Sequence, residues 1–155
     1  MEQSKRDAAS SRILRELQRD SRQTVQELSA KVGLSVSPCW RRVKELEASG
    51  VVRRYTALVE REKVGLSACI LAQVSLLRQT EGAAEQFESA MHACAEVIEC
   101  YSVTGDADYV IKVVLPDVKA YDAFLHRVMF KIKDIGTLRS MVVLREVKYE
   151  TALPV

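Results

Sequence analysis

The sequence predicts an α+β protein in two parts: residues 1–60 are mainly helical, and residues 61–155 alternate strands with helices. Apolar residues recur at helical spacing between residues 10 and 49, whereas β-rich runs and helical patterns alternate from residue 67 onward. The 155 residues are 48% apolar and 28% charged, which is close to an average globular chain and argues against disorder.

Caps and apolar spacing indicate the first two helices. Ser10 or Ser11 can cap a first helix that runs to about residue 20. A second helix follows Thr24, because Thr24 and Glu27 have the spacing of a capping box. It ends at Gly33, since glycine accepts the left-handed conformation that closes many helices.

A third helix is expected over residues 35–49, starting near Ser35 or Ser37 and ending at Gly50. Pro38 is tolerated in its first turn. Its inward apolar stripe comprises Val36, Cys39, Val43 and Leu46. Residues 51–59 are β-rich and favour a hairpin or wing strand. Short helices joined by a glycine turn, followed by a wing, are typical of a winged helix-turn-helix.

The second part has the element order β-α-β-β-α-β, which is the ferredoxin-like arrangement. We expect strands at 67–77, 97–104, 109–115 and 139–149, and helices at 81–94 and 117–132. Such a fold has two helices on one face of an antiparallel sheet. The other face is open and carries apolar residues, so we expect a second subunit to cover it.

The outward face of the third helix is the candidate nucleic-acid reader. Ser37, Arg41, Lys44 and Ala48 lie opposite the apolar stripe, where short polar and basic side chains can meet base edges in a major groove. The candidate DNA-binding residues are Ser35, Ser37, Pro38, Trp40, Arg41, Arg42, Lys44, Arg53 and Arg54. Two alternatives stay open: the charged face is simply solvated, and Trp40 packs at the edge of the core.

Composition and motifs argue against other classes of protein, such as membrane proteins, zinc proteins and enzymes. No apolar run is long enough to span a bilayer and the first twenty residues hold no secretory signal, so we expect a cytoplasmic, nucleoid-associated protein. The four cysteines form no C-x-x-C, so neither a disulfide framework nor a zinc site is expected. We expect no catalytic residues, no metal and no cofactor, because no P-loop, dinucleotide-binding or hydrolase motif is present.

The two most specific runs of the sequence are ELSAKVGLSVSPCWRRVKELEASGVVRRYTALV at residues 27–59 and VIECYSVTGDADYVIKVVLPDVKAYDAF at residues 97–124. Both runs resemble the Lrp/AsnC (leucine-responsive/asparagine-responsive, feast/famine) family of transcription regulators. The resemblance covers nearly the whole chain. It implies an N-terminal domain that binds double-stranded DNA and a C-terminal ferredoxin-like (RAM-type) domain that senses a ligand and dimerises.

The resemblance also implies a small amino acid effector and a homodimer that assembles into tetramers or octamers. The effector candidates carried over from the family are Thr104, Gly105, Asp106, Asp108 and Tyr109, with Arg139 and Ser140 as weaker ones. A glycine turn exposes amides for a carboxylate, and Asp106 can pair with an ammonium. Without the resemblance, residues 105–108 would be a plain hairpin connection. Effectors in the family include leucine, other apolar amino acids, asparagine, lysine and cysteine.

Three functions are weighed on these grounds. The first is a sequence-specific transcription regulator tuned by an amino acid, and the second is an enzyme built on the ferredoxin-like part. The third is an architectural protein that packages DNA without sequence preference. The charge distribution favours DNA: residues 1–60 hold 12 bases and 8 acids, whereas residues 61–155 hold 11 bases and 13 acids. The formal net charge of +2 is therefore the sum of a basic part at residues 1–60 and a mildly acidic part at residues 61–155. Oligomerisation would repeat the basic part and so increase the attraction to DNA.

Overall fold

The computed structural model describes residues 7–77 and 81–155, and the contacts divide the chain into two compact units. A helical unit comprises Met1–Leu58 and Lys148–Val155, and a sheet unit comprises Val59–Val147. The first boundary lies close to the predicted division at 60/61. Residues 148–155 differ from the prediction: they belong to the helical unit because they contact its first helix.

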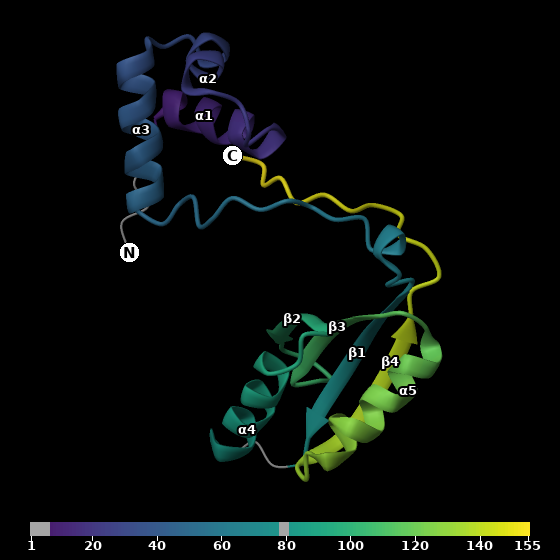
Figure 1. Cartoon of the computed structure of the whole chain (residues 1–155). Coiled ribbons are helices and arrows are strands. Elements are labelled where there is room, and N and C mark those ends of the chain that lie inside the picture. The colour runs from purple at the N-terminus through teal and green to yellow at the C-terminus, as the bar shows by residue number, and fades with distance from the viewer. Residues whose placement is uncertain (1–6, 78–80) are drawn as a thin grey trace. The chain divides into compact units, whose positions relative to one another are not determined.

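Three helices make the helical unit: α1 (Ala8–Arg19), α2 (Val25–Val32) and α3 (Val36–Ala48) (Figure 1). The prediction that Ser10 or Ser11 caps α1 is wrong. Asp7 is the cap, and its Oδ1 accepts the Ser10 amide at 2.7 Å. The predicted capping box of α2 is confirmed, since Thr24 accepts the Glu27 amide and the Glu27 carboxylate accepts the Thr24 amide.

The three helices bury one small core. Gly33 has the left-handed conformation, with φ of 68°, and turns the chain from α2 into α3. The core comprises Ile13, Leu14, Leu28, Val32, Cys39, Val43 and Leu46. Val36 was expected on this inward stripe but is 43% exposed, because it is the first residue of α3.

The predicted wing strand at residues 51–59 does not form within this chain. Residues 53–60 are extended, yet they belong to no strand. A strand requires a backbone ladder with a neighbour, and no described segment of the chain supplies one here.

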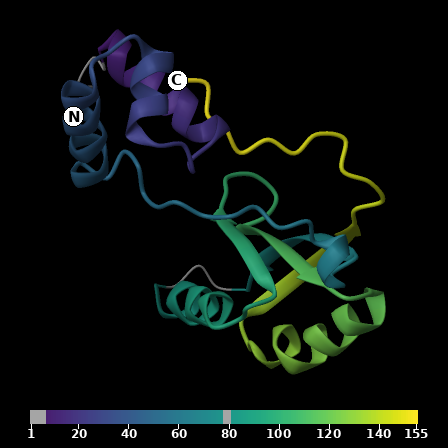
Figure 2. The same cartoon turned by 45° about the horizontal axis from the view of Figure 1, so that its top comes forward.

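The sheet unit has the predicted ferredoxin-like order. Its elements are β1 (Ala68–Leu76), α4 (Glu81–His92), β2 (Val97–Ser102), β3 (Tyr109–Leu115), α5 (Val118–Arg127) and β4 (Ile135–Val142), with short 3₁₀ turns η1 (Glu62–Val64) and η2 (Met129–Lys131). The antiparallel sheet has the strand order β2-β3-β1-β4. Both α4 and α5 cover the same face (Figures 1 and 2).

Two predicted boundaries in this unit are wrong. The last strand is Ile135–Val142 and not 139–149, because only these residues pair with β1. The last helix ends at Arg127 and continues as the 3₁₀ turn η2, so it is shorter than the predicted 117–132. Val143 still donates its amide to the Cys69 carbonyl of β1 at 2.9 Å, but residues 143–149 belong to no strand.

The helix-covered face of the sheet forms the main core, and its opposite face is mixed. Ile70, Ile111 and Val113 are fully buried beneath the helices. The strand registers place two cross-strand rows on the opposite face: Glu99, Lys112, Leu71 and Met141 form one, and Tyr101, Val110, Gln73 and Arg139 form the other. Each row combines two polar with two apolar or aromatic side chains, so the open face is less apolar than the sequence predicts.

Candidate nucleic-acid interface and effector site

The outward face of α3 is positioned as the helical spacing predicts. Ser37, Arg41, Lys44 and Ala48 are all exposed. On the opposite side, Cys39, Val43 and Leu46 are buried against α1 and α2. The buried stripe therefore fixes which side chains α3 presents to solvent.

Glutamates of the same helix neutralise the two bases of this face. Arg41 Nε lies 3.7 Å from a Glu45 carboxylate oxygen, and Lys44 Nζ lies 2.7 Å from Glu47. Glu47 also accepts the Tyr55 hydroxyl at 2.9 Å. The hydrogen bonds from Lys44 and Tyr55 lower the pKa of Glu47, and burial together with this bond raises the pKa of Tyr55 to about 12. Arg41 and Lys44 are therefore both engaged in ion pairs on the surface of α3.

Arg42 is not on the open face. Its side chain is only 29% exposed, and Nη1 lies 2.5 Å from the Asp7 carboxylate that caps α1. Its Nε is buried without a partner among the described residues. The Ser10 amide and hydroxyl, and then Arg42, lower the pKa of Asp7. Arg42 therefore ties the start of α1 to α3, which argues against its predicted role as a phosphate contact.

The remaining DNA-binding candidates are accessible. Ser35 caps α3 in an extended conformation, but its side chain makes no capping hydrogen bond. Trp40 is 52% exposed, so the alternative that it packs at the core edge is not supported. Arg53 and Arg54 are exposed and have no ion-pair partner in the described part of the chain. Pro38 is half-buried in the first turn of α3.

The effector candidates Thr104, Gly105 and Asp106 lie exposed in the connection between β2 and β3. Gly105 has φ of 116°, a conformation that favours glycine. Asp108 is committed to the fold, because its carboxylate accepts the Leu76 amide at 2.7 Å. The backbone carbonyl of Asp106 accepts the Ser75 hydroxyl at 3.2 Å, which leaves the Asp106 carboxylate exposed.

Tyr109 points from β3 into the helix side of the sheet. It is 5% exposed, its ring lies 4.6 Å from that of Phe87, and its hydroxyl donates to Glu88 at 2.8 Å. Burial and the Glu88 carboxylate raise its pKa to about 12. Tyr109 is therefore a core residue of the sheet unit in this chain.

Arg139 and Ser140 lie two strands away from β3 and point to opposite faces. Ser140 shares a hydrogen bond of 2.6 Å with the Tyr121 hydroxyl on the helix side. Arg139 is exposed and lies opposite Gln73 on the other face. The seven effector candidates thus do not converge on one pocket within this chain.

The sheet unit does contain a cavity that the sequence did not indicate. It has a volume of about 320 Å³ and lies between α4 and β2. Its walls include Glu88, His92 and Cys100, and Tyr109 is the one effector candidate that reaches it. The contributing residues all lie between Glu88 and Tyr109, but they follow no motif. No group of three metal-ligating side chains occurs among the described residues, and none of the described helices is long and apolar enough to cross a membrane.

Comparisons with known proteins match both units. A family model described as the Lrp/AsnC ligand binding domain matches residues 69–153. A model described as a winged helix-turn-helix DNA-binding domain matches residues 6–53. The leucine-responsive regulatory proteins of Klebsiella pneumoniae and of Escherichia coli K12 are each 38% identical to this chain over 141 residues, covering 91% of this chain and 86% of theirs.

Solved structures agree with these relatives. A transcriptional regulator from Neisseria meningitidis, solved as its L-Met complex, superposes with a TM-score of 0.92 at 36% identity and covers 96% of both chains. An AsnC family regulator from Agrobacterium tumefaciens superposes with a TM-score of 0.91 at 38% identity, covering 96% of this chain and 97% of its own. The chain therefore belongs to the Lrp/AsnC family of DNA-binding transcription regulators.

Proposed function

We propose that this protein binds specific DNA sequences and that a small apolar amino acid modulates its DNA affinity or its oligomeric state. The observation that carries this proposal is the outward face of α3. Ser37, Arg41 and Lys44 are exposed on a helix whose opposite side is locked into a core, so the helix can enter a major groove without unfolding.

The candidate residues divide by chemistry. Arg41 and Ser37 suit base edges, because a guanidinium can bind guanine through two hydrogen bonds and a serine hydroxyl can both donate and accept. Arg53 and Arg54 suit phosphates, since they are exposed and lie just after the reading helix. Ser35, Pro38, Trp40 and Lys44 flank these contacts at the groove. Arg42 positions α3 through Asp7.

We propose that the effector binds at Thr104, Gly105 and Asp106 with help from a second copy of the chain. Exposed amides of the Gly105 turn can bind a carboxylate, and Asp106 can bind the ammonium. The other candidates point elsewhere within one chain, so an apolar wall from another subunit would complete the site. A homodimer that assembles into a tetramer or octamer would supply this wall, and Arg139 of another subunit would add a cationic contact for the effector's carboxylate.

The DNA half of the proposal is tested by fluorescence anisotropy with a labelled duplex from the upstream region of the protein's own gene. We expect affinity to fall steeply with salt concentration, because phosphate contacts release counterions. Footprinting on the same region should give discrete protected sites. Uniform coverage would favour an architectural DNA-packaging protein, and an absence of salt-sensitive binding would refute the DNA half.

The effector half is tested by thermal shift with all twenty amino acids, starting with L-leucine and L-methionine. A ligand that binds only the native state raises the melting temperature by mass action. We expect a shift with at least one apolar amino acid and no consumption of it in a turnover assay. An unchanged melting temperature with all twenty would refute this half. Because the protein acts on DNA, we place it in the cytoplasm at the nucleoid.

A further inference from the structure

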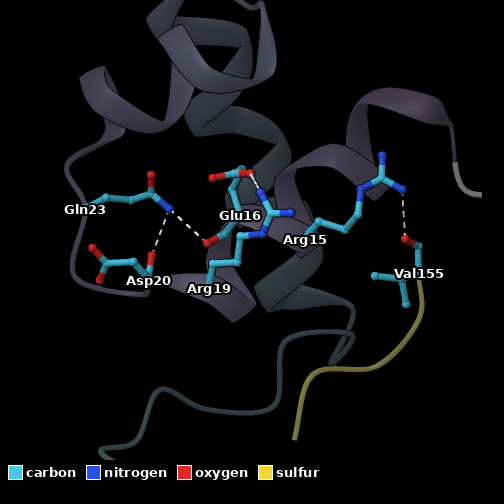
Figure 3. A network of polar contacts seen from close by, with 6 residues as sticks. All are labelled: Arg15, Glu16, Arg19, Asp20, Gln23 and Val155. Carbon is cyan, nitrogen blue, oxygen red and sulfur yellow. Dashed lines mark hydrogen bonds and ion pairs between the residues drawn. The ribbon is translucent and has the colours of Figure 1, made fainter. Parts of the chain in front are cut away.

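Residues 151–155 lie against α1 as an extended segment. The side-chain amide of Gln18 forms two hydrogen bonds with the backbone of Leu153. Its Nε2 donates to the Leu153 carbonyl at 3.2 Å, and its Oε1 accepts the Leu153 amide at 2.6 Å. One helical turn away, Arg15 Nη1 donates to the Val155 carbonyl at 3.0 Å, as Figure 3 shows. These contacts recognise an extended backbone, much as an added strand would be recognised.

An apolar contact accompanies the polar ones. The Val155 side chain is half-buried and packs against the core that also supports α3. The side chain of Leu153 is 68% exposed, although its backbone is bound. A groove of about 1020 Å³ lies beside the segment, with walls from α1 and residues 51–58. Residues 151–153 and Val155 form a further wall of this groove. The helical unit therefore binds an extended segment of this chain on α1, through Gln18, Arg15 and the core position beneath Val155.

This segment is also continuous with the sheet unit. Residues 143–150 connect it to β4, the strand that carries Arg139 and Ser140. The other covalent connection between the two units is the chain at residues 58–59. The two units are thus joined twice, and the second connection depends on the noncovalent contacts of Gln18, Arg15 and Val155.

We propose that residues 151–155 form a tether that docks on α1 and couples the effector-binding unit to the DNA-binding unit. The coupling rests on the function proposed above, whereas the docking does not. A displacement of β4 that pulls on the docked segment acts directly on α1 and the core beneath α3. Release of the segment leaves the two units joined only at residues 58–59, so an effector on one unit no longer changes the other.

Hydrogen–deuterium exchange of the full chain tests the docking. Val155→Asp places a charge against the core and should raise amide exchange in α1 about threefold or more. Leu153→Asp is the matched control, because it makes the same change at an exposed side chain, and exchange should stay as in the parent. Gln18→Ala should resemble Val155→Asp, with Gln26→Ala as its control on the exposed side of α2. Unchanged exchange in β1 and β3 shows that the sheet unit is folded.

The Kd for DNA with and without L-leucine or L-methionine tests the coupling. In the parent, we expect the Kd for DNA with the amino acid to differ from the Kd without it by a measurable factor. Val155→Asp should bring that factor close to one while the thermal shift with the amino acid persists. Equal α1 exchange in Val155→Asp and Leu153→Asp overturns the docking, and an unchanged factor overturns the coupling. A parent that binds no DNA, or responds to none of the twenty amino acids, overturns the proposed function and the coupling with it, whereas exchange still decides the docking.

Discussion

The reading helix α3 and the β2–β3 connection use their polar side chains in different ways. On α3, Arg41 and Lys44 are exposed and form ion pairs with glutamates of their own helix. In the connection, Asp108 holds the backbone of a neighbouring strand, and the next residue, Tyr109, is buried in the core. Side chains of the first kind can exchange partners with a ligand, whereas those of the second kind maintain the fold.

Arg41 and Lys44 are therefore available to bind a ligand. Asp108 and Tyr109 match the family's effector motif, but their side chains are engaged within the fold. An exposed ion pair contributes little stability, so opening it for DNA costs little. A backbone amide left without its acceptor in a half-buried position costs more. The comparison therefore predicts which substitutions affect binding and which affect folding.

The largest expected effect is on sequence recognition by α3. Arg41→Ala should weaken binding to the preferred site by about 1 to 3 kcal/mol, because a bidentate contact to a base is lost. Binding to unrelated DNA should change little. Arg54→Ala should weaken both by similar factors, since it removes a phosphate contact. Competition anisotropy with specific and random duplexes measures both variants, and the opposite pattern would exchange the two roles.

The next effect separates the two aspartates of the connection. Asp108→Ala should lower the free energy of unfolding by about 1 to 2 kcal/mol, because the Leu76 amide loses its acceptor. Asp106→Ala should change it by less than about 0.5 kcal/mol, since its exposed carboxylate supports no backbone. Urea denaturation measures both. Equal losses would mean that both aspartates maintain the fold and that Asp106 is a poor candidate for the effector.

Ionisation of Tyr109 should lower the free energy of unfolding at alkaline pH. Its pKa is raised to about 12, so the folded protein keeps the phenolic proton after the unfolded chain loses it near pH 10. Stability therefore falls between pH 10 and about pH 12, with a slope of up to ~1.4 kcal/mol per pH unit from this group. Urea denaturation of Tyr109→Phe should show a shallower slope. Glu88→Gln should reduce the slope without abolishing it, because burial also raises this pKa.

The smallest expected effect concerns the acid that neutralises α3. Glu47→Gln removes the partner of Lys44 and a negative charge near the phosphates, so DNA affinity should rise about twofold to fivefold. Glu16→Gln on α1 is the matched control, since Glu16 forms a similar pair with Arg19. Anisotropy at low and high salt measures both. A fall in affinity for Glu47→Gln would mean that Tyr55 and Lys44 need this carboxylate to hold the reading helix in place.

Local signals made the helical unit largely predictable. The capping box of α2, the turn at Gly33 and the faces of α3 depend on residues close together in sequence. The true cap of α1 was missed because Ser10, Ser11 and Asp7 are all suitable caps. What distinguishes Asp7 is its ion pair with Arg42, which lies 35 residues further along the chain.

The effector candidates were less predictable because a sheet arranges residues by register. Neighbouring residues on a strand point to opposite faces, so Arg139 and Ser140 could not both reach one site within the chain. The strand order β2-β3-β1-β4 separates them further from the β2–β3 connection. The end of β4 at Val142 likewise depends on the extent of its pairing with β1.

The division of the helical unit between Met1–Leu58 and Lys148–Val155 has a consequence for biosynthesis. A ribosome adds roughly 5 to 20 residues per second, so Val59–Val147 takes roughly 4 to 18 seconds to emerge after the three helices have been made. During this interval the apolar position that Val155 covers is open, and Gln18 and Arg15 lack their backbone partners at Leu153 and Val155. A nascent chain can therefore complete its DNA-binding unit only after the sheet unit has been synthesised. The core beneath α3 is fully packed only once the effector-binding unit is present.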